Sequence, residues 1–165
     1  MAYEIIEQCG GMPPTVLMVP TSRGDLLWGL WEGLVELRRN ALLHELPRLI
    51  AVEPVPRLSR VLAGEDYRQT FDGASHALVS VRGTTATYQA VLALRESMGS
   101  AVEVSTTGAE AAQQELAQRG LYVELSSAAS LAGLRELLKS GHVDGADRVV
   151  LVLTSHGYKA EATKG

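Results

Sequence analysis

A cluster of small and polar residues follows the first strongly apolar stretch of the sequence. In VPTSRGDLLWGLWEG, residues 19–33, the apolar run ends at Pro20 and an amphipathic segment begins at Asp25. The first backbone N–H groups of a helix have no partner within it, and they carry the positive end of the helix dipole. A strand that turns directly into a helix can therefore bind an anion such as a phosphate. Residues 21–25 are a candidate anion site.

The same residues are compatible with an ordinary helix cap. Ser22 could cap the helix while Asp25, three residues later, reaches back to it in a capping box. The carboxylate of Asp25 would also occupy the field that favours a phosphate, and Arg23 would partly offset its charge. The residues alone leave both interpretations open.

A second polar corner, TSHG at residues 154–157, ends the most apolar strand-like segment. It contains the residue types of a nucleophile and its base, but adjacent residues rarely face one another and no G-x-S-x-G motif is present. Thr154 is better explained as a hydrogen-bonding hydroxyl at the end of a strand, or as the source of a local turn bond. The 4 histidines show no metal-ligand spacing, which disfavours a metal site.

Short apolar runs alternate along the chain with segments of helical periodicity. We expect strands at residues 15–20, 48–56, 100–105, 121–125 and 148–157. We expect helices at residues 1–8, 25–39, 58–64, 84–97, 107–120 and 126–141. Gly29 and Gly33 lie one turn apart and predict close packing of the second helix on the sheet. Ser126 or Ser127 is expected to cap the last helix.

This alternation predicts a single α/β domain over residues 1–165, with three αβα layers and a mostly parallel sheet. In such sheets, ligands bind at the carboxyl ends of the strands. Residues 21–25 and 154–157 both follow apolar strands, so we expect the two polar corners to lie at the same edge.

The composition argues against several classes of main partner. Apolar residues make up 46% of the chain, charged residues make up 21%, and the formal net charge is -4. Without a Lys/Arg-rich block or a run of about 18 apolar residues, neither nucleic acid nor a membrane is expected as a partner. Cys9 is the only cysteine, and the first residues do not resemble a signal peptide, so a cytoplasmic location is expected.

Five blocks in order give a more specific indication. They are VPTSRGDLLWGLWEGL, LPRLIAVEPVP, ALRESMGSAVEVS, GLYVELSSAASLAGL and RVVLVLTSHGYK. Together they resemble the carboxyl-terminal half of threonine synthase and its relatives among the fold type II pyridoxal-phosphate enzymes, the tryptophan synthase beta-like family. The resemblance runs from residue 2 to residue 159, and only residues 57–83 match poorly. It implies the Rossmann-like large domain of that family.

The resemblance also assigns roles to both polar corners. The family's phosphate-binding loop, rich in glycine and asparagine, falls on Ser22, Arg23, Gly24 and Asp25, of which only Gly24 keeps the small character. The family threonine that hydrogen-bonds the pyridine nitrogen of pyridoxal 5'-phosphate falls on Thr154. A hydroxyl at that position leaves the ring nitrogen largely unprotonated and so moderates its electron withdrawal.

Residues around the second corner match the family less uniformly. Glu124 matches a glutamate on the cofactor's side of the sheet, although Leu125 stands where a proline usually follows. Ser155 replaces a glycine of the family, whereas His156 and Gly157 match. By resemblance, Glu124 is among the residues that would bind the cofactor.

The resemblance places the Schiff-base lysine in the family's amino-terminal half, and Lys139, Lys159 and Lys164 match neither its position nor its context. We therefore expect part of an enzyme that converts O-phospho-L-homoserine and water to L-threonine and phosphate, without activity alone. A cloned piece, a split-gene product and one part of a two-chain enzyme all remain open. The chain would act on its amino-acid substrate when completed by an amino-terminal half, as a homo-oligomer or with a partner chain.

Two alternatives stay open beside this interpretation. One is a non-catalytic domain of the same fold that binds a protein partner or a small metabolite, an idea favoured by Arg23 and Asp25. The other is a fragment of a related pyridoxal-phosphate lyase, such as threonine dehydratase or cysteate synthase.

Overall fold

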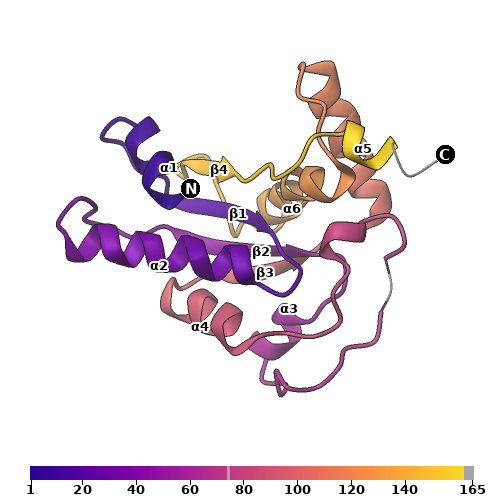
Figure 1. Ribbon diagram of the computed structural model, residues 1–165, viewed down its shortest axis with the longest axis horizontal. Coiled ribbons are helices and arrows are strands. Elements are labelled where there is room, and N and C mark those ends of the chain that lie inside the picture. The colour runs from indigo at the N-terminus through magenta and orange to yellow at the C-terminus, as the bar shows by residue number, and fades with distance from the viewer. Residues whose placement is uncertain (74, 162–165) are drawn as a thin grey trace.

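A parallel sheet forms the centre of the protein (Figure 1). The computed structural model describes residues 1–73 and 75–161, and within them the sheet has 4 strands in the order β3-β2-β1-β4. The strands are β1 (Val16–Pro20), β2 (Arg48–Glu53), β3 (Ser100–Glu103) and β4 (Val149–Leu151). Each paired strand is parallel to its neighbour. All strands therefore end on the same side of the molecule.

Helices cover both faces of this sheet. They are α1 (Ala2–Gln8), α2 (Asp25–Arg39), α3 (Leu58–Leu62), α4 (Tyr88–Glu96), α5 (Thr106–Gln118), α6 (Leu125–Ser140) and α7 (Tyr158–Glu161), with a 3-10 turn, η1, at Val79–Val81. Helices α1, α2 and α4 pack on one face, and α5 and α6 pack on the other (Figure 1). The expected three-layer α/β arrangement is confirmed.

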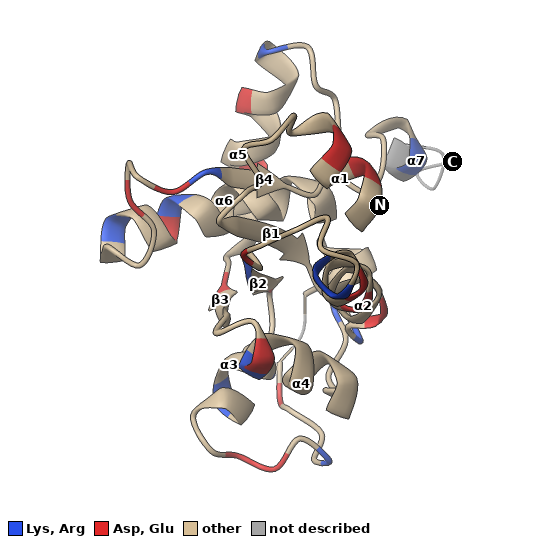
Figure 2. Ribbon diagram, turned by 90° about the vertical axis from the view of Figure 1, so that its left-hand side faces the viewer, with Lys and Arg blue, Asp and Glu red and all other residues tan. Residues whose placement is uncertain are grey.

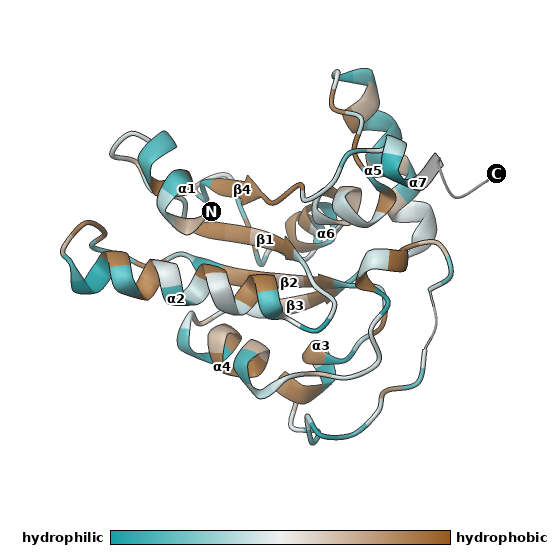
Figure 3. Ribbon diagram, in the orientation of Figure 1, coloured by the Kyte–Doolittle hydropathy of each residue, from teal (hydrophilic) through white to brown (hydrophobic). Residues whose placement is uncertain are grey.

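The strands separate two apolar cores. Leu17 and Val19 of β1 face the core under α2 and α4, whereas Val16 and Met18 face the core under α5 and α6. Every residue of β1 is buried, because both faces of the sheet are covered. Figure 3 shows the apolar strands between helices whose outer surfaces are more hydrophilic. This double burial explains the continuous apolar runs in the sequence.

Residues 121–125 do not form the predicted strand. Val123 makes an isolated antiparallel bridge with His156, and Leu125 already begins α6. Helices α5 and α6 pack against each other, and only a short connection joins them. This connection pairs with the chain that follows β4 instead of adding a strand to the sheet.

Two predicted helix starts also need correction. Helix α4 begins only after its N-cap, Thr87, because residues 84–86 are in extended or irregular backbone. Ser126 and Ser127 lie inside α6, and neither caps it; the N-cap is Glu124, without a side-chain cap bond. Both serines are buried, so their hydroxyls bond to neighbouring segments rather than to the helix end.

The two glycines of α2 have different surroundings. A Cβ built on Gly33 would approach the Cβ of Ala2 to 2.7 Å, so Gly33 permits close packing against α1 and not against the sheet. Gly29 is exposed, and a Cβ there would have open space around it. The predicted packing role is therefore wrong for Gly29, and for Gly33 it applies to a different neighbour.

Figure 2 shows acidic and basic residues interspersed along the helices and loops. The side chains of Glu53, Arg57 and Glu124 are nevertheless buried. His44 and His142 are exposed near the ends of elements. Across the described ranges, no helix combines the length and apolar character that crossing a membrane requires.

Candidate functional site

The corner between β1 and α2 turns at Gly24. This residue is the N-cap of α2 and has a left-handed backbone conformation, with φ of 101°. A Cβ built on it would lie 2.3 Å from the Cβ of Ala90 in α4. Only glycine satisfies both the positive φ and the close approach. The predicted capping box is wrong, because Ser22 is not the N-cap and no side chain caps α2.

The backbone N–H groups of this corner are available to a ligand. Within the described part of the chain, none of the N–H groups of residues 22–27 has a hydrogen-bond partner. The first N–H of α2 that bonds internally belongs to Trp28, which donates to the carbonyl of Gly24 at 2.9 Å. Consecutive N–H groups around a left-handed residue form a concave anion-binding nest, and the helix dipole adds to it.

A cavity of about 260 Å³ joins the two polar corners. It is lined by Pro20, Thr21, Ser22, Arg23, Gly24, Asp25, Leu26, Leu27, Ser80, Val81 and Thr154. The structure thus brings Thr154 and residues 22–25 to one cavity at the carboxyl ends of β1 and β4. This is the arrangement that the parallel sheet predicts.

Thr154 is held by Ser127, which the sequence predicted only as a possible helix cap. The hydroxyls of Thr154 and Ser127 lie 3.0 Å apart, and the N–H of Ser155 donates to the Ser127 hydroxyl at 3.0 Å. Ser127 is fully buried, whereas Thr154 is exposed to solvent at the cavity. A buried hydroxyl therefore orients an accessible one. The sequence did not predict that Ser127 is buried within α6, because Ser126 and Ser127 both resembled helix caps.

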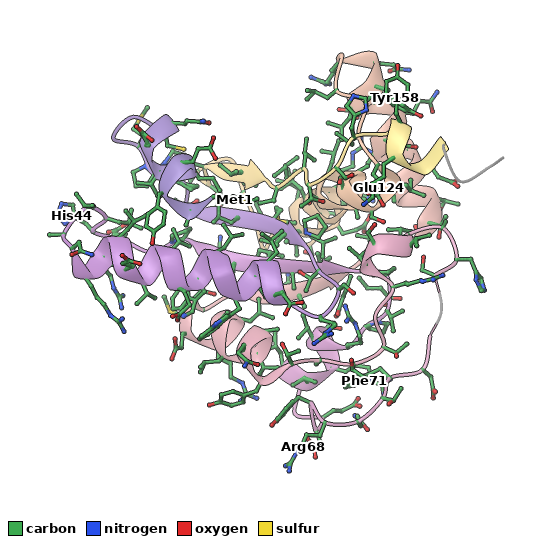
Figure 4. All side chains as sticks on the ribbon, viewed as in Figure 1. Met1, His44, Arg68, Phe71, Glu124 and Tyr158 are labelled. Carbon is green, nitrogen blue, oxygen red and sulfur yellow. The ribbon has the colours of Figure 1, made fainter. Side chains whose placement is uncertain are left out.

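Glu124 lies just behind the cavity. Its carboxylate accepts a hydrogen bond from the hydroxyl of Ser80, and it is 3.5 Å from Nζ of Lys159. Its N–H donates to the carbonyl of Ser155 at 2.9 Å. Figure 4 shows Glu124 near Tyr158, on the side where the strands end, and His44 at the opposite end. Glu124 reaches the cavity through Ser80 and does not line it itself.

Arg23 and Asp25 are the two charged residues at the corner. Both are exposed, and within residues 1–73 and 75–161 neither takes part in an ion pair. Their opposite charges therefore act on whatever occupies the cavity. The Asp25 carboxylate opposes an anion there, and the Arg23 guanidinium attracts one.

The lysines of the described residues do not line this cavity. Lys139 lies near the end of α6 and pairs with Glu136 at 2.7 Å, and Lys159 pairs with Glu124. Lys164, which does not match the family lysine in sequence, lies outside the described residues.

The residues present fit a phosphate-bearing cofactor with a heterocyclic nitrogen. The unpaired N–H groups of residues 22–27 supply donors for the phosphate. The hydroxyl of Thr154 supplies a hydrogen-bonding group on the same cavity.

The fold and this cavity define an α/β domain with a candidate phosphate site at the carboxyl ends of its strands. The sequence model of the family described as "Pyridoxal-phosphate dependent enzyme" matches residues 1–155, and the chain belongs to this family. The family depends on pyridoxal phosphate.

The curated relatives that match this chain include threonine synthases. Threonine synthase of Methanocaldococcus jannaschii is 27% identical over 96% of this chain and 41% of its own length. Threonine synthase of Halalkalibacterium halodurans is 32% identical over 96% of this chain and 44% of its own length. The chain thus spans less than half the length of these relatives.

Solved structures share the fold. A threonine deaminase from T.th. superposes with a TM-score of 0.73 at 23% identity, covering 94% of this chain and 49% of the deaminase. A serine racemase from Dictyostelium discoideum gives a TM-score of 0.69 at 21% identity, covering 94% of this chain and 47% of the racemase. The fold type II architecture predicted from the five sequence blocks is confirmed.

Proposed function

We propose that this chain supplies the phosphate-binding corner and the ring-nitrogen partner of a threonine-synthase-like enzyme. The full reaction would convert O-phospho-L-homoserine and water to L-threonine and phosphate. The observation that carries the proposal is the single cavity shared by Thr154 and the unpaired N–H groups of residues 22–27. The similarity to threonine synthases favours this reaction over other reactions of the family.

Each part of the site would have its own task. The N–H groups of residues 22–25 would bind the cofactor phosphate and anchor it by the end that does not react. The Thr154 hydroxyl, oriented by Ser127, would donate to the ring nitrogen and keep it unprotonated. When bound, pyridoxal phosphate supplies an electron-withdrawing ring that stabilises negative charge developing on the substrate.

We further propose that the lysine that binds the cofactor covalently comes from a different polypeptide segment. Lys139 and Lys159 are held in ion pairs away from the cavity lining. Residues 1–165 would then bind the cofactor but show no turnover alone. Addition of a polypeptide carrying the rest of the family's length should restore activity.

The edge of the sheet gives such a polypeptide a place to bind. Strand β4 is at one edge, and its residues Val149, Val150 and Leu151 are only half-buried, although this segment is strongly apolar. An exposed apolar edge strand readily pairs with another strand. We propose that the remaining part of the family's fold, or a second copy of this chain, covers this edge in a cytoplasmic assembly. Light scattering tests this: a monomer at all concentrations, unchanged by the added polypeptide, would contradict it.

A second candidate is a non-catalytic domain that binds a metabolite or a protein. The exposed carboxylate of Asp25 at the cavity favours it, because this charge weakens phosphate binding. Such a domain would keep the fold without binding pyridoxal phosphate.

Calorimetric titrations with pyridoxal phosphate and with inorganic phosphate distinguish the two candidates. The first candidate predicts saturable binding of both ligands. Replacement of Thr154 by Val should weaken the binding of pyridoxal phosphate by about fivefold to tenfold, which is the contribution of one hydrogen bond to affinity. The affinity for inorganic phosphate should stay unchanged. No binding of either ligand, with or without the completing polypeptide, would sink the first candidate.

A further inference from the structure

An ion pair is completely buried beneath the phosphate corner. The side chains of Arg57 and Glu53 are both 0% exposed, and Nε of Arg57 lies 3.4 Å from a carboxylate oxygen of Glu53. Removing two charges from water is costly and rarely adds net stability, even when the charges are paired. The role of this pair therefore lies in the groups that its two side chains hold in place.

Glu53, the last residue of β2, holds the start of α3. Its carboxylate accepts hydrogen bonds from the N–H of Leu58 at 3.1 Å, the N–H of Ser59 at 3.0 Å and the hydroxyl of Ser59 at 3.0 Å. The carboxylate is thus saturated with donors and lies next to the guanidinium. This arrangement fixes the position of Arg57, which immediately precedes α3.

Arg57 uses its planar guanidinium to bind the backbone of the corner. One terminal nitrogen donates to the carbonyl of Ser22 at 2.5 Å and to that of Thr85 at 3.1 Å. The other terminal nitrogen donates to the carbonyl of Thr21 at 2.8 Å. Burial lowers the pKa of Arg57, and the negative charge of Glu53 offsets only part of this effect. An arginine nevertheless keeps its charge in proteins.

These contacts determine where the N–H groups of the corner point. In a planar trans peptide, the C=O of one residue and the N–H of the next point in opposite directions, and the described residues contain no cis peptide. Arg57 holds the carbonyls of Thr21 and Ser22, so the N–H groups of Ser22 and Arg23 point away from it. The hydroxyl of Thr87 likewise holds the carbonyl of Arg23, at 2.9 Å, and turns the next N–H in the same way.

We propose that Arg57 is a positioning residue that orients the backbone N–H groups of residues 22 and 23 toward the cavity, with Glu53 holding it in place. That these N–H groups bind a phosphate rests on the proposed function. Arg57 itself does not touch the ligand. It pre-organises donors that would otherwise be free to rotate, because the corner is a loop.

A lysine could not replace this arginine. The lysine ammonium has a single nitrogen and lacks the planar fork of the guanidinium, so it cannot donate to the carbonyls of Thr21, Ser22 and Thr85 together. Arg57→Lys keeps the positive charge beside Glu53 while losing the fork. Gly83→Ala offers a second variant that keeps both buried charges: its Cβ would meet a terminal nitrogen of Arg57 at 2.9 Å and the hydroxyl of Ser22 at 3.0 Å.

The orientation is measured without any ligand. Residual dipolar couplings report the directions of the Ser22 and Arg23 N–H vectors in the chain and in each variant. Arg57→Lys and Gly83→Ala should change these two couplings and leave those of β1 unchanged. The matched control is Arg48→Lys, which alters the Arg48–Asp147 pair at the opposite end of β2 and should leave the corner couplings unchanged. Unaltered couplings in both folded corner variants would overturn the proposal.

Ligand titration adds a test that distinguishes this proposal from the proposed function. Each N–H that turns away should weaken the binding of inorganic phosphate and of pyridoxal phosphate by about tenfold. The affinity for pyridoxal, which lacks the phosphate, should change little. If the unaltered chain binds neither phosphate ligand, the proposed function fails, and the dipolar couplings still decide the role of Arg57. Altered couplings with unchanged phosphate affinity would contradict the role of these N–H groups in binding.

Discussion

At the scale of single residues, the phosphate corner combines favourable backbone groups with one unfavourable side chain. Unpaired N–H groups of residues 22–27 attract an anion, whereas the carboxylate of Asp25 repels it from the same cavity. The effect of Asp25 is moderate, because its side chain is exposed and water screens its charge.

Replacement of Asp25 by Asn should strengthen phosphate binding. Removing one exposed charge near the ligand is worth about 1 kcal/mol, or about fivefold in affinity at low salt. Calorimetry with inorganic phosphate measures this change. The matched control is Glu32→Gln, which removes an equal charge from an exposed position nearly two turns further along α2. Unchanged affinity for Asp25→Asn would show that the corner is only a helix start.

Sequence reasoning located the corner but not the contacts that shape it. The residue types of Gly24 and Asp25 marked a strand-to-helix turn, and Thr154 marked the polar corner that follows β4. Arg57 gave no signal and Ser127 gave only that of a helix cap, because their roles come from contacts with residues far away in the chain. A buried arginine cannot be distinguished from a surface arginine without the fold.

At the scale of elements, the conformation of Gly24 couples the start of α2 to α4. Gly24→Ala should destabilise the protein by about 2 kcal/mol or more, through the left-handed backbone and the contact with Ala90. In contrast, Gly29→Ala should stabilise it by about 0.5–1 kcal/mol, because Gly29 is exposed within the helix and its Cβ would meet nothing. Urea unfolding measures both. Equal effects of the two substitutions would contradict the described corner.

The elements that the sequence predicted best are those with the clearest pattern. The buried strand β1 and the amphipathic helix α2 lie where apolar runs and periodicity place them. Residues 121–125 are predicted as a strand yet join two helices, because they lie beside the chain that follows β4 and not beside a strand of the sheet. The sequence pattern of such a segment therefore indicates an extended backbone, but it does not indicate which part of the chain the segment pairs with.

At the scale of the whole molecule, Asp147 links the start of β4 to Arg48 of β2 and to Thr15, which precedes β1. Asp147 accepts hydrogen bonds from the hydroxyl of Thr15 at 2.7 Å and from Arg48 at 3.0 Å. The hydrogen bond from Thr15 and the contact with Arg48 lower the pKa of Asp147. These bonds fix β4 beside β1 at the end of the sheet opposite the cavity.

Asp147→Asn should therefore reduce stability in a pH-dependent way. A lowered pKa in the folded state means that the charged form contributes stability above the pKa of the unfolded state. The variant should lose about 1 kcal/mol at pH 7, and the difference should shrink as the pH falls below about 4. Urea unfolding at several pH values measures it. A difference that stays constant down to about pH 2 would contradict this assignment.

The central claim is that the N–H groups of residues 22–25 and the hydroxyl of Thr154 hold one cofactor in one cavity. Amide chemical shifts followed by NMR during a titration with pyridoxal phosphate test it most directly. We expect saturable shifts at Ser22, Arg23, Gly24, Asp25 and Thr154, with one common affinity, and small changes at β3 and α5. Saturable shifts confined to other residues, or none at the corner, would contradict it.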